Sequence, residues 1–244
     1  MITSPHNEKL KEVRKLSGRR ERARSGRFVA EGEDLVAAAA AAGWEPVYTL
    51  CAAGSGLPGE EVTPALLAGA SELGSGSRSV AVYAQRWAPA PPGALIVHLD
   101  GIRDPGNVGA ILRSAEAFGA SCVAFGPESA DPYGPKAVRA SMGSVFSIPL
   151  VRVRTAAALP GAKVALDGDA SDVLGSAAAP IEAWRARVRA TDPVPLTLIV
   201  GSERDGLSAD ARAAADHFAR IPIAIHSLNA AMAVTVALYE LTRA

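Results

Sequence analysis

The chain has 244 residues, of which 49% are hydrophobic, and its 25 basic side chains balance its 25 acidic ones. This length and composition predict a buried core, with room for one large domain or two small ones, and they exclude a wholly disordered chain. A formal net charge of zero gives no bulk electrostatic signal for nucleic-acid binding.

Basic charge is concentrated near the start of the chain. Nine lysines and arginines but only two acids lie between Lys9 and Arg27. We expect a cationic helix here, which would supply contacts to phosphate groups. Residues 26–43 then predict a short strand, a turn and an Ala-rich helix that ends at a glycine.

The rest of the first domain alternates between the two kinds of element. Residues 47–53 and 79–85 predict strands, and a short helical segment is expected over 61–73. A proline-rich stretch follows, and it predicts a stiff linker at residues 89–94. We therefore expect a small α/β domain over residues 1–88 and a second domain over 95–244.

The second domain predicts a mostly parallel sheet with helices on both faces, because strands and helices alternate along it. Residues 169–192 are compatible with either a helix or a loop. Strands are expected at residues 94–100, 122–126, 163–168, 194–201 and 219–224, and helices at 107–119, 136–142, 208–217 and the C-terminus.

Cysteine and histidine usage restricts the class of protein. Cys51 and Cys122 lie in apolar predicted strands, so packed reduced thiols and a cytoplasmic location are expected. No apolar leader is evident, and the run Ala37–Ala42 is too short to span a bilayer, so membrane insertion is not expected. The four histidines show no metal-ligand spacing, and no metal site is expected.

Three segments of the second domain each lead from a strand into a polar turn and a helix, which is how α/β sheets build ligand sites. In the first, the turn at residues 104–107 exposes a helix N-terminus that favours anions. Asn107 is equally compatible with an ordinary N-cap, and Arg113 with a surface arginine. The turn has neither the G-x-G-x-x-G spacing nor a P-loop lysine, which disfavours a nicotinamide enzyme or an NTPase.

The other two segments are individually generic. A buried strand ends at Gly201, where backbone can approach a ligand closely, and Ser208 is expected to cap the next helix. Further on, Ser227 or Asn229 is expected to cap an apolar terminal helix, which needs a core or a second subunit to cover it. His226 is more typical of a loop histidine than of a catalytic residue.

Together, and in this order, the segments resemble the three signature motifs of the SpoU (TrmH-like) family of RNA 2'-O-methyltransferases, within the SPOUT superfamily. The resemblance covers roughly residues 95–244, and residues 1–85 resemble, less specifically, the family's ribosomal-protein-like substrate-binding domain. The matching residues are Asn107, Gly109 and Arg113 (N-x-G-x-x-x-R), Gly201, Glu203, Gly206 and Leu207 (G-x-E-x-x-G-L), and Ser227, Leu228 and Asn229 (S-L-N).

The resemblance implies a SPOUT-type parallel sheet with a C-terminal trefoil knot, which the order of elements alone does not predict. It also implies a homodimer formed through the C-terminal domain, and S-adenosylmethionine bound in the knot. Many relatives have a longer, Gly-containing loop before S-L-N, whereas residues 224–226 bridge it here. The residues implied to bind the donor are Gly201, Ser202, Glu203, Gly206, Ile221, Leu228 and Asn229.

The catalytic residues implied by the resemblance are Arg113, Asn107, Glu203, Asn229 and Ser227. An arginine keeps its proton at physiological pH, so we expect Arg113 to stabilise the developing alkoxide or to bind a neighbouring phosphate. The expected substrate is structured RNA, with large-subunit ribosomal RNA favoured over tRNA. A non-catalytic RNA-binding protein is the main alternative, and a Rossmann-type methyltransferase is disfavoured because no Gly-rich donor loop follows the first strand.

Overall fold

The computed structural model describes residues 1–71, 77–175, 183–186, 190, 194–225 and 227–243. The chain forms two compact units, and each is described by itself. The first comprises Met1–Arg86 together with Asp131–Ser147, and the second comprises Trp87–Ala130 with Ile148–Ala244. This division differs from the contiguous domains expected from the sequence, because the segment Asp131–Ser147 leaves the second domain and joins the first unit.

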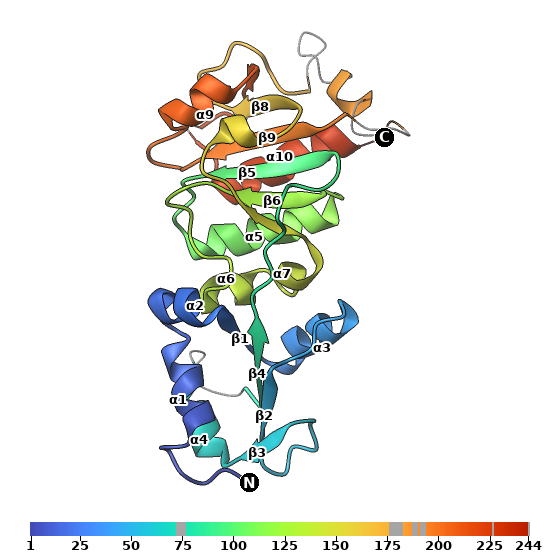
Figure 1. Cartoon of the computed structure of the whole chain (residues 1–244). Helices are drawn as coiled ribbons and strands as arrows, with labels where there is room; N and C mark the ends of the chain where they lie inside the picture. Colours follow the sequence, from blue (N-terminus) through green and yellow to red (C-terminus); the bar gives the residue numbers. More distant parts are fainter. Residues whose placement is uncertain (72–76, 176–182, 187–189, 191–193, 226, 244) are drawn as a thin grey trace. The chain divides into compact units, whose positions relative to one another are not determined.

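The first unit contains a four-stranded sheet in the order β1-β4-β2-β3 (Figure 1). Strands β1 and β2 are antiparallel to β4, whereas β3 is parallel to β2. The alternating α/β domain expected from the sequence is confirmed. The strands are β1 (Arg27–Glu31), β2 (Tyr48–Ala52), β3 (Glu60–Val62) and β4 (Ser79–Ala84).

The basic segment forms two helices rather than one. Helix α1 ends at its C-cap residue Leu16, and Gly18 caps the start of α2 with an extended backbone. Glycine is a poor residue for a helix interior, which accounts for the break at this position. The helices are α1 (Glu8–Lys15), α2 (Arg19–Ser25), α3 (Glu33–Ala41) and α4 (Pro64–Ala68).

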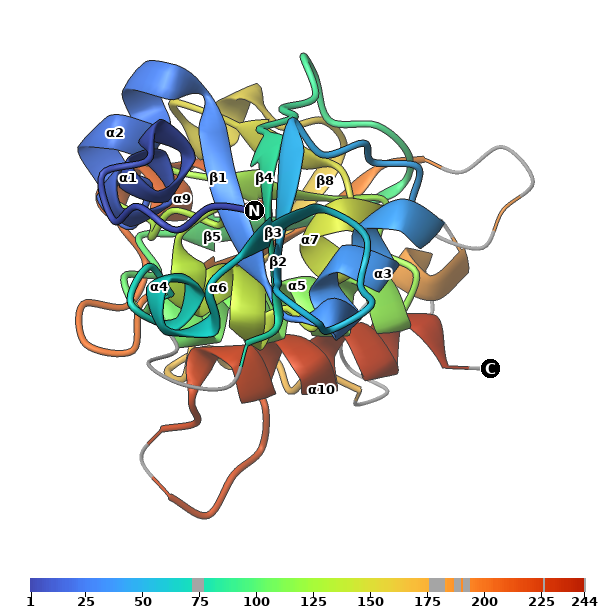
Figure 2. The ribbon, with the colours of Figure 1, turned by 90° about the horizontal axis from the view of Figure 1, so that it is seen from below.

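Each face of this sheet has its own core. Leu10 of α1 and its C-cap residue Leu16 pack with Val29 and Val82 on one face. The pairing partners Phe28 and Tyr83 point to the other face, since side chains alternate along a strand. Helix α3 lies on this second side of the sheet, opposite α1 and α4 (Figure 2).

Aromatic packing explains why Asp131–Ser147 belongs to the first unit. The segment carries helices α6 (Pro135–Ala140) and α7 (Ser144–Ser147). Its Tyr133 ring centroid lies 4.5 Å from that of Phe28, and Phe146 lies 5.2 Å from Tyr83. Aromatic pairs at these separations add attraction to the area that they bury. The segment therefore completes the second core of the small sheet.

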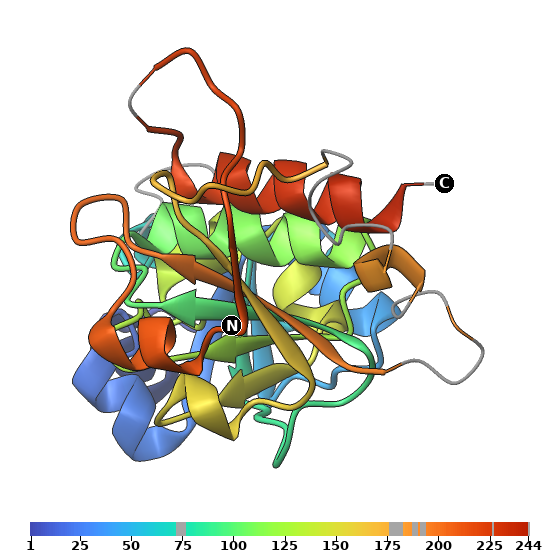
Figure 3. The same ribbon diagram turned by 90° about the horizontal axis from the view of Figure 1, so that it is seen from above.

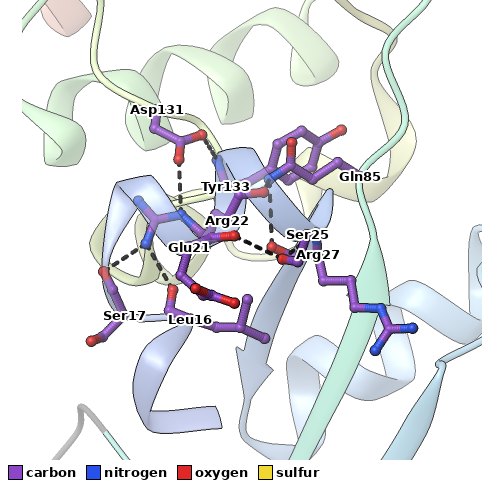
Figure 4. A network of polar contacts seen from close by, with 9 residues as sticks. All are labelled: Leu16, Ser17, Glu21, Arg22, Ser25, Arg27, Gln85, Asp131 and Tyr133. Atoms are coloured by element: carbon purple, nitrogen blue, oxygen red, sulfur yellow. Dashed lines mark hydrogen bonds and ion pairs between the residues drawn. The ribbon is translucent and has the colours of Figure 1, made fainter. Parts of the chain in front are cut away.

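Arg22 is a buried residue of the predicted cationic helix (Figure 4). Only 4% of Arg22 is exposed, and its Nε donates to Asp131 Oδ2 at 2.8 Å. Its Nη1 donates to the carbonyl oxygens of Leu16 and Ser17 at 2.8 and 2.6 Å. Because a buried guanidinium needs such partners, Arg22 stabilises the turn between α1 and α2. The expectation that the whole basic segment faces phosphate groups is wrong for this residue.

The second unit contains a six-stranded, fully parallel sheet in the order β10-β8-β9-β5-β6-β7. Every residue of β5 is buried, as expected of a strand covered on both faces. The parallel sheet predicted from the sequence is confirmed. The strands are β5 (Leu95–Asp100), β6 (Cys122–Phe125), β7 (Leu150–Arg152), β8 (Ala162–Leu166), β9 (Leu196–Gly201) and β10 (His217–Ala219).

Helices cover both faces of this sheet. The helices α5 (Pro105–Ala117) and α10 (Ala230–Thr242) lie side by side on one face (Figure 3). Their contact includes a hydrogen bond of 2.6 Å between Ser114 Oγ and Thr235 Oγ1. The other face packs against α9 (Ala209–Ala214) and the short 3-10 helix η1 (Ala156–Ala158), through a cluster of small and branched side chains.

Several predictions for the second unit need correction or lie outside the structure. The strand expected over 219–224 occurs earlier, as β10, because Pro222 lacks the N–H that a strand ladder needs. Strand β7 is not predicted by the sequence pattern. Within the segment 169–192, residues 183–186 are helical, and most of the remainder lies outside the described residues. The trefoil knot stays a prediction, since strand order and pairing do not define how the chain is threaded.

Both cysteines are buried and unpaired, which confirms the expected free thiols. Burial raises the pKa of the Cys122 thiol to about 12, so this side chain stays protonated and unreactive at neutral pH. Among the described residues, no helix is long and apolar enough to cross a membrane.

Candidate active site

The carboxyl ends of β5 and β9 are adjacent. The two strands pair in parallel, with Asp100 opposite Gly201 at their ends. The turns that follow these strands therefore start at the same edge of the sheet, where parallel α/β folds bind ligands. The start of α10 also reaches this edge, because its N-cap Asn229 is hydrogen-bonded to Asn107 in the first turn of α5.

Asn107 does not cap helix α5. The N-cap is Asp104, whose side chain accepts a 2.9 Å hydrogen bond from the backbone N–H of Asn107. Capping by Asn107, one of the two interpretations of this residue, is therefore wrong. With its backbone N–H satisfied by Asp104, Asn107 stands in the first helical turn and its amide is left to make other contacts.

The side chain of Asn107 joins the other two motif segments. Its Nδ2 donates to Glu203 Oε1, and its Oδ1 accepts a 2.8 Å hydrogen bond from Asn229 Nδ2. Glu203 also accepts from the backbone N–H of Ala230, at 3.4 Å. One residue from each motif thus enters a single network, although these residues are 96 and 122 positions apart in the sequence.

The two predicted helix caps in this region are present. Asn229 is the N-cap of α10, and its Oδ1 accepts from the backbone N–H of Ala231 at 2.9 Å. Ser208 caps α9, with its Oγ accepting from Ala211 at 3.1 Å. Satisfying these otherwise unpaired N–H groups defines where each helix begins.

A cavity of about 210 Å³ lies beside this network. It contains most of the residues that the family resemblance implies for donor binding, and it also contains Ser227. Asn229 is in the network but does not line the cavity. The expected donor residues that do line it are Gly201, Ser202, Glu203, Gly206, Ile221 and Leu228.

The loop after β9 is closed on itself. Ser202 and Gly206 exchange two backbone hydrogen bonds of 3.0 Å, and Gly206 adopts a positive φ of 66°. A β-carbon added to Gly201 would lie only 2.3 Å from the carbonyl oxygen of Gly206. Glycine at position 201 therefore permits a close backbone approach that a larger residue would prevent.

Arg113 does not join the network. It lies six residues beyond Asn107 on α5, which places it about 9 Å further along the helix and rotated by about 240° around the axis. Its side chain is exposed and has no hydrogen bond or ion pair in the described part of the chain. Within one chain, the structure brings Asn107, Glu203 and Asn229 together but leaves Arg113 on a different helix face.

The segment before the third motif is only partly described. Residues 222–225 are exposed and have no regular structure, and His226 lies outside the described residues. Ser227 is exposed and lines the cavity.

Sequence reasoning missed a second group of cavity residues. Asp167 and Gly168 directly follow β8 and line the cavity, as does Arg212 of α9, which pairs with Asp167 at 2.7 Å. The signal was present in the sequence, since polar residues at the carboxyl end of any strand of a parallel sheet reach the same edge. No group of three or more His, Cys, Asp and Glu side chains that could hold a metal ion occurs among the residues that the structure describes.

His98 is a buried titratable group on β5, only 1% exposed, whose Nδ1 lies 3.2 Å from the carbonyl oxygen of Ala124. Burial lowers its pKa from 6.5, although nearby Asp100 and the Ala124 carbonyl oppose this shift. The unfolded chain then binds a proton at a higher pH than the folded chain does. The stability that neutral His98 contributes is therefore complete above about pH 6.5 and is lost as the pH falls towards the lowered pKa.

We expect the melting temperature of the wild-type protein to fall as the pH drops from 7 to 5, and the decline to be shallower in His98→Gln. Glutamine can still donate to Ala124 but does not titrate. Thermal unfolding of both proteins across this pH range checks the prediction. Parallel curves would show that His98 does not contribute to the pH dependence.

Two models of known protein families match the chain. The family model of the SpoU rRNA Methylase family matches residues 94–239, and that of the MRM3-like substrate binding domain matches residues 7–78. The first match covers more than half of the chain. A parallel sheet with this site thus defines a methyltransferase of the SPOUT type, and the chain belongs to the SpoU rRNA methylase family.

Individual relatives agree with this assignment. The chain is 32% identical to a 23S rRNA (uridine(2479)-2'-O)-methyltransferase of Streptomyces viridochromogenes, over 93% of this chain and 86% of that protein. It is 27% identical to the 23S rRNA (guanosine(2553)-2'-O)-methyltransferase RlmP of Bacillus subtilis, over 98% of each. An AdoMet-bound rRNA methyltransferase from Sinorhizobium meliloti superposes with a TM-score of 0.83 and 31% identity, over 99% of this chain and 97% of that one.

Proposed function

We propose that this protein transfers a methyl group from S-adenosylmethionine to a ribose 2'-hydroxyl of structured RNA, with large-subunit ribosomal RNA as the substrate. The observation that carries the proposal is the meeting of three motif segments at one cavity, through Asn107, Glu203 and Asn229. The rRNA methyltransferases of similar sequence support the choice of substrate.

The cavity has the chemistry that the donor needs. Val200, Leu207, Leu228 and other apolar residues line part of it and offer contacts for an adenine ring. Polar groups of Ser202 and Ser227, with the backbone around Gly201, offer partners for the ribose and the amino acid portion. S-adenosylmethionine supplies an electrophilic methyl group bonded to sulfonium sulfur.

Methyl transfer requires the ribose oxygen to lie in line behind the methyl carbon and to lose its proton. In this proposal Arg113 binds the developing alkoxide or the adjacent phosphate, since a guanidinium cannot accept a proton. Asn107 orients the ribose or Arg113, and Glu203 holds the motif loops together by accepting hydrogen bonds. Ser227 and Asn229 contact substrate or donor.

A homodimer would place Arg113 at an active site to which both subunits contribute. Helix α10 has an exposed apolar stripe of Met232, Val236 and Tyr239, which are 61%, 38% and 52% exposed. These positions recur at spacings of four and three, so they share one helix face. We infer that a second copy of the chain covers the stripe and that motif residues of both copies contribute to each site. This arrangement explains why Arg113 has no hydrogen-bond or ion-pair partner among the described residues of a single chain.

The cations of the basic segment differ in whether they are already paired with an acidic side chain. Arg22 is buried, and four other cations of the basic segment pair with acids, namely Lys9, Lys11, Arg24 and Arg27. Lys15, Arg19 and Arg20 are exposed and form no hydrogen bond or ion pair within the described ranges of the chain. We propose that these three side chains contact RNA phosphates.

Replacing Lys15, Arg19 and Arg20 together with glutamine is expected to make RNA binding less sensitive to salt. Each phosphate contact contributes about 0.7 to 0.9 to the slope of log K against log salt concentration, so the slope should become less negative by about 2 to 3. Filter binding or fluorescence anisotropy between 50 and about 300 mM salt measures this slope.

The control changes Lys9, Lys11 and Arg24 to glutamine, because these cations are already paired with acids and the loss of net charge is the same. It should alter the slope less. Equal slopes for the two triple variants would mean that net charge, rather than specific phosphate contacts, governs the binding.

The function is tested by incubating the protein with labelled donor and unmodified total RNA and then mapping alkali-resistant ribose positions. We expect one modified site in large-subunit ribosomal RNA. Modification of tRNA alone would mean that tRNA, and not ribosomal RNA, is the substrate. Failure to bind S-adenosylmethionine in calorimetry would favour the non-catalytic RNA-binding protein.

We also propose a cytoplasmic location, which the two unpaired buried thiols support.

A further inference from the structure

The loop from Gly201 to Ser208, which we call the donor loop, lines the cavity with five of its residues. Three side chains between the end of β5 and the first turn of α5, namely Asp100, Arg103 and Asn107, contact this loop. Two of these contacts, from Asn107 to Glu203 and from Arg103 to Asp205, involve exposed partners in the loop. Asp100 makes the third contact, and Asp100 itself is buried.

Asp100 holds the end of the donor loop with both carboxylate oxygens. Its Oδ2 accepts from the backbone N–H of Ser208 at 2.6 Å, and its Oδ1 accepts from Ser208 Oγ at 3.0 Å. Asp100 is 8% exposed, so the acceptor side of these bonds is shielded from water, whereas Ser208 is exposed. Hydrogen bonds to a charged group are stronger than neutral ones.

The backbone of the same residue lies beside the beginning of the loop. Asp100 lies opposite Gly201 in the β5–β9 ladder. Ser208 in turn caps α9 by accepting from Ala211. Both ends of the donor loop are therefore placed relative to one residue of β5, whereas the Arg103–Asp205 pair between them is more than 60% exposed on each side and contributes little.

We propose that Asp100 is a positioning residue for donor binding, acting through Ser208 to hold the backbone of the donor loop in its binding conformation. This inference rests on the proposed function, because it takes S-adenosylmethionine to be the occupant of the cavity. Asp100 itself does not line that cavity.

The Asp100→Asn variant tests the proposal. Asparagine keeps the size of the side chain but removes its negative charge and one acceptor oxygen, so the hydrogen bonds to Ser208 are no longer charge-assisted. We expect the Kd for S-adenosylmethionine and its KM to rise about tenfold or more, as for the loss of a charge-assisted hydrogen bond. The KM for RNA should stay within about twofold of wild type.

Asp210→Asn is the matched control. Asp210 lies on α9, and its carboxylate accepts from Thr155 Oγ1 and the backbone N–H of Ala156, neither of which belongs to the donor loop. The same chemical change there should leave the donor Kd within about twofold of wild type.

A double-mutant cycle separates positioning from general destabilisation. Ser208→Ala keeps the backbone N–H but removes the hydroxyl, and should raise the donor Kd by a smaller factor than Asp100→Asn. If Asp100 acts through Ser208, the two effects on donor affinity will not multiply in the double variant. If Asp100→Asn does not fold, the donor Kd of Ser208→Ala decides alone, and a value equal to wild type overturns the proposal.

Donor affinity unchanged in a folded Asp100→Asn protein would overturn the inference, as would equal rises in the KM values for donor and RNA. Fully multiplicative effects in the cycle would also overturn it. A wild-type protein that binds no S-adenosylmethionine would instead refute the proposed function, so the two failures are distinguishable.

Discussion

Replacing Arg113 with alanine is expected to lower the turnover of methyl transfer to RNA by about 100- to 1,000-fold. The reason is the loss of a positive donor at the developing alkoxide, which costs about 3 kcal/mol of transition-state stabilisation in comparable sites. Donor binding should hardly change, because Arg113 does not line the cavity. Single-turnover methyl transfer together with calorimetry of donor binding measures the two effects separately.

Because Arg113 is exposed, its replacement should affect catalysis without affecting folding. Its side chain has no hydrogen bond or ion pair with any described residue, so its removal should not alter the stability of the unit. Arg154→Ala is a matched control, since Arg154 is another exposed arginine of the same unit outside the cavity. It should retain turnover within about twofold. Wild-type turnover in Arg113→Ala would refute the assigned role.

Gly201→Ala is the second substitution with a large expected effect, and it acts on donor binding. The added β-carbon would lie 2.3 Å from the carbonyl oxygen of Gly206 and 2.7 Å from the backbone nitrogen of Leu207. These neighbours are backbone atoms, so the donor loop has to move as a whole. We expect the Kd for S-adenosylmethionine to rise at least about 100-fold, because five residues of this loop line the cavity and the loss of two of their contacts, at about 1.4 kcal/mol each, gives that factor.

Calorimetry and the shift in melting temperature caused by saturating donor both measure this loss. A protein that binds donor should be stabilised by it, and Gly201→Ala should show little stabilisation. Gly69→Ala is the control for the change of residue type, because its β-carbon would stay 3.4 Å from the nearest atom. Donor affinity equal to wild type in Gly201→Ala would show that the close approach at Gly201 has no part in binding.

The parts of the fold that local patterns specify were predictable. Apolar runs predicted the buried strands β5 and β9, and a polar residue before an apolar run predicted the caps Ser208 and Asn229. These features depend on residues within about one helical turn of each other. The three motifs were also visible in the sequence, because each is a short run with its own spacing.

Other assignments failed because they depend on residues distant in the sequence. Arg22 looks like any other cation of its segment, and only Asp131, 109 positions away, makes it a buried structural residue. Likewise, residues 131–147 lie in sequence between β6 and β7 of the second unit, but Tyr133 and Phe146 complete the aromatic core of the first. Local periodicity contains no information about such partners.

The family, the parallel sheet and the three turns that carry the motif residues could all be predicted from the order of amino acids. The tertiary structure alone decided which side chains meet: Asn107 with Glu203 and Asn229, and Asp100 with Ser208. The physical reason is that hydrogen bonding and side-chain periodicity along one element act over a few residues, whereas the contents of a site depend on strand pairing. Pairing β5 with β9 places residues about 100 positions apart at one edge of the sheet.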